Sequence, residues 1–142
     1  MATNKETVDR VWELMESDRI DQLTEVLADD LDFFMPGFKI TGVAEMQDML
    51  RAYKVGFPDL HHNTVDFIEQ GDKIALELRV VGTHTGTLVG ALGEIPATGK
   101  EVVWESVDYV TVKDGKITSW HVYHDTIPFL TQLGLMQVPT TA

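Results

Sequence analysis

The chain has 142 residues, of which 44% are hydrophobic and 24% are charged, with a net charge of −12 and no cysteine. This size and balance predict a globular protein with one domain over residues 1–142. The negative charge disfavours nucleic acid and anionic membranes as partners, and the lack of cysteine excludes disulfides and thiolate chemistry. No apolar run reaches the roughly 18 residues of a membrane helix, and the N-terminus shows no secretory signal, so we expect a cytoplasmic location.

The first third of the chain shows helical periodicity. Thr3 and Glu6 have capping-box spacing, and apolar residues recur at helical intervals after them. A second helix is expected after Asp18, followed by a short strand over "LDFFMPGF". A third helix comes next, and the proline of "FPDL" predicts its end.

From residue 61 onward the apolar period changes from 3.6 to 2. The segments "HHNTVDFIEQ" and "KIALELRVVGTH" predict one hairpin, and "EVVWESVDYVTV" with "ITSWHVYHD" predicts another. The Gly- and Pro-rich stretch between the hairpins is expected to be a loop, and a short helix closes the chain. Three helices followed by antiparallel strands predict the α+β class. The sheet should curve around the helices, leaving a concave face for a pocket and a convex face for a second subunit.

Strict alternation along the last strand assigns its side chains to two faces. One face would carry Ile117, Ser119, His121, Tyr123 and Asp125. The other would carry Thr118, Trp120, Val122 and His124. If the first face is concave, Asp125 is desolvated beside aromatic groups, and desolvation raises the pKa of a carboxyl toward values useful for proton transfer. The alternative is that Asp125 caps the final helix, but Pro128 favours a cap at Thr126 or Ile127.

Other polar residues have two interpretations each. His84 lies on an otherwise apolar strand face and could point into the core or into the pocket. Asp108 alternates with Trp104, so on the pocket side it would be a second perturbed acid and on the other side an ordinary surface residue. His61 and His62 are adjacent and diverge, so only one of them can enter a pocket.

Motifs of several enzyme classes are missing from the sequence. No serine lies in a G-x-S-x-G elbow, and there is no P-loop or dinucleotide fingerprint. No histidines and carboxylates have convincing metal-ligand spacing. Proton chemistry in an apolar pocket, or ligand binding without chemistry, remains.

Five segments resemble a known family in order and spacing: "FPDLHH", "GTHTG", "PATGK", "KDGKI" and "HDTIPFLTQLG". They are similar to those of the SnoaL-like polyketide cyclases, also called predicted ester cyclases, of the nuclear transport factor 2-like superfamily. The resemblance runs from about Trp12 to Gly134. It implies a cone-shaped α+β barrel, usually paired through its sheet.

The resemblance also implies a mechanism. An aspartate at the position of Asp125 would act as general acid/base in an intramolecular aldol condensation of an aromatic polyketide ester. No cofactor is implied, because the conjugated substrate itself delocalises the enolate. The chain departs from the family at Pro128, where glycine is frequent, and at His121, where tryptophan is common. The second departure places a titratable group beside the implied acid.

We therefore expect a cofactor-independent cyclase-type enzyme that acts on a hydrophobic, carbonyl-bearing small molecule. Asp125 would be the acid/base, with His121 and His84 binding a substrate carbonyl or tuning Asp125. The pocket walls and substrate contacts are expected to be Trp12, Phe34, Tyr53, His62, Trp104, Asp108 and Tyr123. No metal is expected, and a homodimer is expected through the convex face.

Two alternatives stay open at this point. The first is another proton-transfer enzyme on the same barrel, such as an isomerase, a dehydratase or an epoxide hydrolase. A hydrogen-bonded contact between His84 and Asp108 in the cavity would favour it. The second is a ligand-binding or dimerisation module without catalysis, which a cavity filled by the protein's own side chains would favour.

Overall fold

The computed structural model describes residues 2–139. Along this part of the chain the elements are α1 (Asn4–Glu16), the 3₁₀ helix η1 (Ile20–Glu25), β1 (Leu27–Met35), β2 (Phe38–Thr41), α2 (Val43–Gly56), β3 (His61–Gln70), β4 (Lys73–Thr83), β5 (Leu88–Gly90), β6 (Gly93–Ile95), β7 (Glu101–Lys113), β8 (Lys116–His124) and α3 (Thr126–Gln132). None of the helices described is long and apolar enough to cross a membrane.

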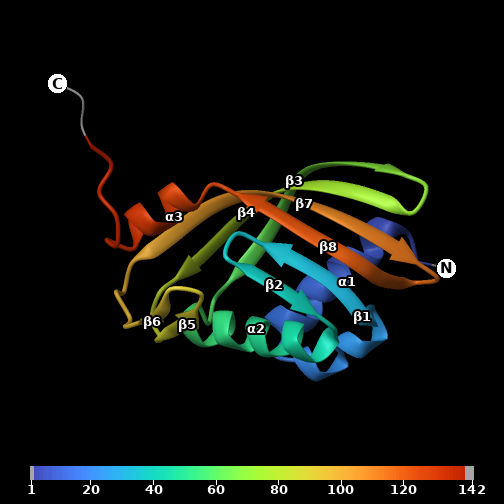
Figure 1. Cartoon of the computed structure of the whole chain (residues 1–142), viewed down its shortest axis with the longest axis horizontal. Coiled ribbons are helices and arrows are strands. Elements are labelled where there is room, and N and C mark those ends of the chain that lie inside the picture. Colours follow the sequence, from blue (N-terminus) through green and yellow to red (C-terminus); the bar gives the residue numbers. More distant parts are fainter. Residues whose placement is uncertain (1, 140–142) are drawn as a thin grey trace.

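Six of the described strands form one curved sheet in the order β2-β1-β8-β7-β4-β3 (Figure 1). Neighbouring strands are antiparallel except β1 and β8, which run parallel. Figure 1 shows α1 and α2 against one side of the sheet and α3 at the end of β8. The predicted α+β class, with early helices packed in a curved, mostly antiparallel sheet, is confirmed.

The first helix forms as the sequence predicts. The Thr3 hydroxyl accepts a hydrogen bond from the Glu6 backbone at 3.1 Å, and the Glu6 carboxylate accepts one from the Thr3 backbone at 2.8 Å. These bonds satisfy N–H groups that a helix start otherwise leaves free. One face of α1 is completely buried through Val8, Val11 and Leu14, so the helix is held by apolar packing.

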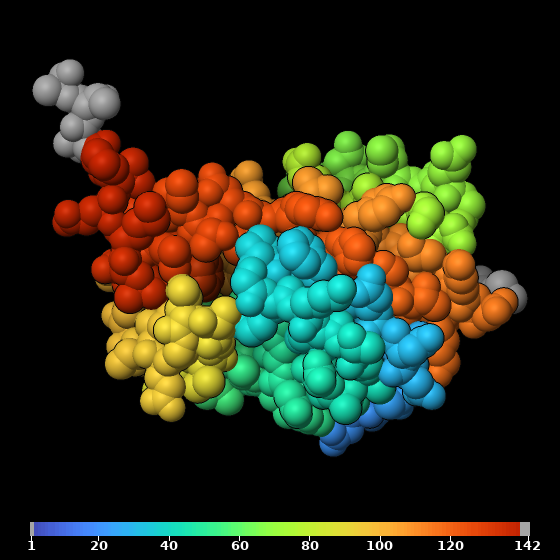
Figure 2. All heavy atoms as spheres, viewed as in Figure 1, coloured from blue at the N-terminus to red at the C-terminus, as the bar shows by residue number. Residues whose placement is uncertain are grey.

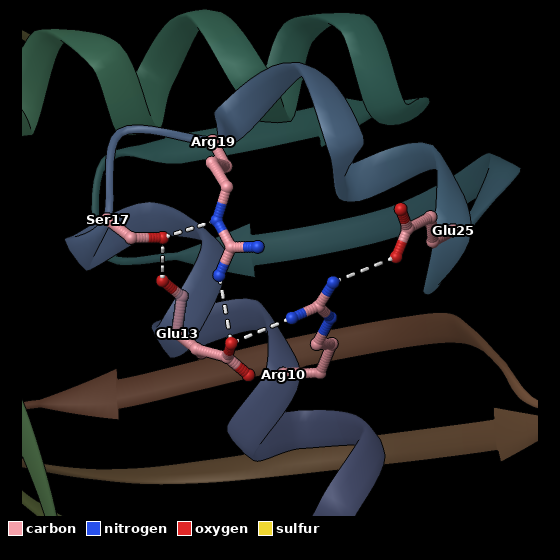
Figure 3. A network of polar contacts seen from close by, with 5 residues as sticks. All are labelled: Arg10, Glu13, Ser17, Arg19 and Glu25. Carbon is pink, nitrogen blue, oxygen red and sulfur yellow. Dashed lines mark hydrogen bonds and ion pairs between the residues drawn. The ribbon is translucent and has the colours of Figure 1, made fainter.

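The predicted second helix is instead the short 3₁₀ helix η1. Asp18 has a positive φ of 58°, which turns the chain sharply after α1. A surface network then ties the two elements together (Figure 3): Arg10 bonds Glu13 and Glu25, and Arg19 bonds Glu13. Because these groups are exposed, the network fixes orientation more than it adds stability.

Two short hairpins were not predicted. The strand expected over "LDFFMPGF" turns at Gly37, where φ is +87°, and returns as β2. The stretch expected to be a loop contains the β5–β6 hairpin, whose Leu88 and Ile95 are buried. Figure 2 shows this yellow hairpin next to the β1–β2 turn. Three-residue strands carry too little periodicity to be recognised from sequence alone.

The faces of the last strand are the reverse of those predicted. The β7–β8 register shifts between Thr111 and Val112, so that Thr118 is an extra residue between Ile117 and Ser119. Such a bulge changes the alternation of every later residue. Ile117 and Trp120 are therefore both fully buried, although strict alternation places them on opposite faces. Trp120, Val122 and His124 were expected on the surface that contacts a second subunit. That assignment is wrong, because these side chains line the interior cavity.

The loop after β4 packs tightly on the end of α2, and this contact is testable. A Cβ added to Gly86 would lie 1.9 Å from the carbonyl oxygen of Val55, which is backbone and cannot rotate away. We expect Gly86→Ala to lower the free energy of unfolding by about 1–3 kcal/mol in urea titrations. Gly90→Ala is the control, because its Cβ would meet Phe38 at an ordinary 3.4 Å. Equal stability of the two variants would contradict the close approach.

Candidate active site

A cavity of about 80 Å³ lies between the helices and the concave face of the sheet. Most of its lining is apolar and comes from α1, α2, α3 and the strands β1, β4, β7 and β8. The lining residues with a polar atom in the side chain are Trp12, Tyr53, His62, Trp104, Ser106, Asp108, Trp120 and His124. A few polar groups in an apolar hollow are typical of small-molecule sites.

Asp108, on β7, is the buried carboxylate of this cavity. Its side chain is held from two sides: Trp120 Nε1 donates to Oδ2 at 2.9 Å and the Ser106 hydroxyl donates to Oδ1 at 2.9 Å. Only 2% of Asp108 is exposed. Burial raises the pKa of Asp108 to about 6, and the two hydrogen bonds limit the rise. The group can therefore gain or lose a proton near neutral pH.

His124 lies beside this network. It is the cross-strand partner of Ser106, which bonds Asp108, and it lines the cavity. Its Nδ1 atom is buried and has no hydrogen-bond partner among the described residues. Burial lowers the pKa of His124, and the adjacent Asp125 opposes that shift. A neutral imidazole with a free nitrogen can bind a polar group of a ligand.

A second polar group is centred on His62, at the start of β3. Its ring stacks on Trp12 with 3.8 Å between centroids and 5° between planes. Glu16, at the end of α1, accepts a hydrogen bond from the His62 backbone at 3.0 Å, and its Oε1 lies 3.6 Å from Nδ1 of the ring. Burial would raise the pKa of Glu16, but these contacts and His61 lower it to about 2. Glu16 is thus ionised beside the imidazole.

A larger outer chamber of about 230 Å³ adjoins the first. The two share the walls formed by Met35, Tyr53, His124 and Phe129. The outer chamber is bordered by the β1–β2 turn, the β5–β6 hairpin and α3, and Figure 2 shows the yellow hairpin between the cyan turn and the left end of the molecule. Burial raises the pKa of Tyr53 to about 12, so its hydroxyl keeps its proton and is a donor at the boundary.

Several expected site residues do line the cavity. Trp12, Tyr53, Trp104 and Asp108 all do, as does His62, whereas its neighbour His61 contacts Glu16 from the exposed side. The cavity is not filled by the protein's own side chains. A filled cavity would have favoured a binding module without catalysis, so the structure gives that alternative no such support.

Asp125 follows the alternative interpretation of the sequence, in which it caps the final helix. It is exposed, it is outside the lining of both chambers, and it is the N-cap of α3. Its Oδ1 accepts a hydrogen bond from the Ile127 backbone at 3.0 Å. Pro128 is then the third helical residue, where a missing N–H costs nothing, because first-turn N–H groups have no partner within the helix. The predicted inward orientation of Asp125 is therefore wrong.

Three further expected residues lie on the outer face of the sheet. Phe34 packs against His121 and Tyr123, with ring centroids 6.1 and 5.6 Å away, and Tyr123 is 56% exposed. His121 Nε2 lies 3.0 Å from the Asp32 carboxylate on the same face. The bulge at residue 118 reverses the strand, and Phe34 follows because β1 pairs with β8. None of the three lines either chamber.

His84 is buried but lies outside both chambers. Its Nδ1 is 3.0 Å from the Thr98 hydroxyl, and its ring packs 5.2 Å from Phe57. His84 thus holds the loop before β7 against the core. No hydrogen bond joins it to Asp108 in the part of the chain described here, so the contact that would have favoured a dehydratase-like pair is not formed.

The sequence reasoning missed three polar members of the cavity: Ser106, Trp120 and His124. One signal could have found them, because a tryptophan in a strand of a small protein is usually buried. Placing Trp120 inside would have brought His124 inside as well, because the two alternate on one face of the strand. Among residues 2–139, no three histidine or carboxylate side chains are grouped to hold a metal ion.

The raised pKa of Asp108 predicts a pH-dependent stability. A carboxyl whose folded pKa exceeds its unfolded value stabilises the fold at low pH and loses this contribution as pH rises through about 6. Asp108→Asn can keep both hydrogen bonds without a charge. Its stability relative to the natural chain should therefore increase between pH 4 and pH 7, by up to about 3 kcal/mol in urea unfolding. Parallel stability curves would contradict the perturbed carboxyl.

Comparisons with known proteins agree with this architecture. The family model of the SnoaL-like polyketide cyclases matches residues 5–133. The aklanonic acid methyl ester cyclase DnrD of Streptomyces peucetius is 26% identical over 140 residues, which cover 94% of this chain and 92% of that protein.

Solved structures share the fold. A protein of Jannaschia sp. CCS1, described as a candidate SnoaL-like polyketide cyclase, superposes with a TM-score of 0.80 at 20% identity and covers 94% of this chain and 93% of its own. IdmH from Streptomyces antibioticus, a candidate polyketide cyclase, superposes with a TM-score of 0.78 at 22% identity. The match covers 94% of this chain and 99% of IdmH. The chain thus belongs to the SnoaL-like polyketide cyclase family and is an enzyme of the cyclase type.

Proposed function

We propose that this enzyme closes a ring in a hydrophobic, carbonyl-bearing small molecule of the polyketide ester type, by intramolecular aldol condensation and without a cofactor. The observation that carries the proposal is Asp108, a carboxyl with a pKa of about 6 inside an apolar cavity. Family membership supports the reaction type, and the name of the Streptomyces peucetius relative supports an ester substrate.

The reaction asks the protein mainly to move protons. A C–H bond beside a carbonyl breaks, the resulting carbon attacks a second carbonyl carbon, and the second carbonyl oxygen takes up a proton. No atom is gained or lost in this carbon–carbon bond-forming step. Asp108 is suited to handle one of these protons because burial raises its pKa toward neutrality, and Trp120 and Ser106 fix its orientation. His124, beside Ser106, is placed to bind a carbonyl oxygen or hydroxyl of the ligand.

The size of the two chambers supports a particular binding mode. The inner cavity measures about 80 Å³. Sites for drug-sized ligands usually measure about 300–1,000 Å³. The reacting end of a polyketide would therefore lie in the inner cavity near Asp108, and the remainder would occupy the outer chamber against apolar residues such as Phe38, Leu88 and Leu130.

Two carboxylates compete for the role of acid/base, and one pair of variants separates them. The resemblance assigns the role to Asp125, which stays a prediction, whereas burial and orientation favour Asp108. We expect Asp108→Asn to lower kcat about 10²–10⁴-fold, as loss of a general acid/base does. Asp125→Asn should keep most activity, because asparagine caps a helix as well as aspartate. Ring closure of aklanonic acid methyl ester, followed by absorbance and mass spectrometry, is the assay.

Each outcome of this experiment has one interpretation. Loss in Asp125→Asn with retention in Asp108→Asn would assign the acid to Asp125 and leave Asp108 a structural role. Thermal unfolding of Asp108→Asn at or above the temperature of the natural chain, at the assay pH, would show that its loss reflects chemistry and not unfolding. No turnover by the natural protein on this ester or on shorter aromatic polyketide esters would contradict the proposed substrate class.

We also propose that the convex face of the sheet pairs two copies of the chain. Its exposed apolar side chains are Val107, Tyr109 and Tyr123, at 46%, 42% and 56% exposure, next to Phe34. Val107 and Tyr123 are cross-strand partners, as are Tyr109 and His121, so these side chains form a continuous patch. A contiguous exposed apolar patch marks an association surface, and a two-fold axis lets the patch contact itself.

The oligomeric state tests the proposed surface. Val107→Asp should shift the protein from dimer to monomer at micromolar concentration, measured by light scattering after gel filtration, because an unpaired charge would be buried at the interface. Val55→Asp is the matched control, since Val55 is 60% exposed on α2 and adds the same charge elsewhere. A monomeric natural protein, or a dimer that survives Val107→Asp, would contradict this interface.

A further inference from the structure

We propose that His62 is the general base that removes the carbon-bound proton, with Glu16 as its positioning residue and Asp108 as the acid on the other side of the reaction. This inference rests on the proposed function, because it assigns the two protons of that reaction to two groups. It gives a catalytic role to a carboxylate–imidazole pair formed where α1 ends and β3 begins.

The geometry of His62 leaves one ring nitrogen for a ligand. Glu16 Oε1 accepts the backbone N–H of His62 at 3.0 Å, which fixes the carboxylate to the strand, and it lies 3.6 Å from the buried Nδ1, which has no hydrogen-bond partner within residues 2–139. The two nitrogens of an imidazole point in different directions, and Nε2 is therefore directed away from Glu16. His62 lines the inner cavity with only 10% of its side chain exposed. Nε2 is the atom that can meet a substrate.

The charge of the ionised Glu16 acts on the His62 ring from the side of Nδ1. A carboxylate beside Nδ1 favours the tautomer with its hydrogen on Nδ1, which leaves a lone pair on Nε2. Burial lowers the pKa of His62 and thus favours the neutral ring that can accept a proton. Glu16 opposes this shift, so it also stabilises the imidazolium formed when Nε2 takes a proton.

A continuous aromatic wall connects this base to Asp108. The His62 ring lies 3.8 Å from Trp12, the Trp12 ring lies 5.0 Å from Trp120, and Trp120 Nε1 bonds Asp108 at 2.9 Å. Base and acid therefore lie at the two ends of one wall of the same cavity. The nucleophilic carbon and the carbonyl oxygen of an aldol reaction are likewise separated by the bond being formed. The indole Nε1 of Trp12, in the middle of this wall by sequence of contacts, is buried without a hydrogen-bond partner within residues 2–139.

The protons balance in this arrangement. Nε2 of His62 takes the proton from the carbon next to a carbonyl, and the electron pair of that C–H bond forms the new C–C bond. The π electrons of the attacked carbonyl move to its oxygen, which takes the proton of neutral Asp108. The cycle closes when the imidazolium returns a proton to the Asp108 carboxylate through water after the product leaves. Burial favours the neutral form of both groups, which is the starting state of this step.

The pH dependence follows from the groups around His62. Glu16 on α1 raises its pKa and His61, on the same strand, lowers it. The residue paired with His62 on the neighbouring strand β4 is Val80, and Trp12 covers one face of the His62 ring. Neither of these two residues carries a charge. Removing the charge of Glu16 should therefore lower the pKa of His62.

The test uses two probes, so that proton removal is measured apart from ring closure. The first is hydrogen–deuterium exchange at the acidic carbon of 2-tetralone in D₂O, followed by NMR. The second is ring closure of aklanonic acid methyl ester. His62→Gln should slow both by about 10²-fold or more. Glu16→Gln should lower kcat about tenfold with little change in KM, and should move the acid limb of the pH profile to lower pH.

A matched control and a spectroscopic readout exclude a merely structural role. His61→Asn removes the other imidazole on Glu16, which is exposed and outside the cavity, and should slow both reactions far less than His62→Gln does. The NMR titration midpoint of the His62 ring should fall in Glu16→Gln. An unchanged midpoint, or losses of equal size in His61→Asn, would overturn the role of Glu16.

The outcomes separate this inference from the proposed function. If the natural protein closes the ring and His62→Gln does so at a similar rate, the inference fails and the proposed function stands. If the natural protein neither exchanges the ketone nor closes the ring, the proposed function fails and His62 loses its role with it. Retained exchange with lost ring closure in His62→Gln would also overturn His62 as the base.

Discussion

A carboxyl group buried among apolar side chains is the constraint on which the rest of the site depends. Burying Asp108 without partners would be costly, and Trp120 and Ser106 reduce that cost by donating one hydrogen bond to each of its oxygens. Burial still disfavours the charged form of Asp108, and it therefore raises the pKa of this carboxyl to about 6. The same burial that weakens the fold at neutral pH makes the group useful for proton transfer, which is a common relation between stability and activity at active sites.

The curved sheet and the helices serve this carboxyl by keeping water away from it. Trp12 and Trp120 meet edge to face at 5.0 Å and form the wall that leads from Asp108 to His62. The smaller strands β5 and β6 do not contribute to that wall, but they border the outer chamber. The main sheet and the helices thus enclose the buried carboxyl, while the short peripheral strands shape the outer chamber.

An aspartate just before the last helix is compatible with two roles, helix capping and catalysis, and Asp125 occupies this position. A carboxylate just before a helix satisfies a free backbone N–H and interacts well with the helix dipole, and Asp125 does this for Ile127. The resemblance to the cyclases gives the same residue a catalytic role. Exposure and capping in this structure favour the first role, and the charge of Asp125 next to His124 is its remaining link to the cavity.

The sequence by itself determined the class of the fold, the capped first helix, the two long hairpins and the resemblance to the cyclases, because each rests on local periodicity or on a contiguous motif. It also placed Trp104 and Asp108 on one face of β7 correctly, since no bulge interrupts β7 between them. Only the tertiary structure decided which way the last strand faces. One extra residue at Thr118 reverses every later side chain, and the burial of Trp120, which no local pattern encodes, selects that reversal. The choice between His61 and His62 likewise depended on where Glu16 and Trp12 of α1 meet the start of β3.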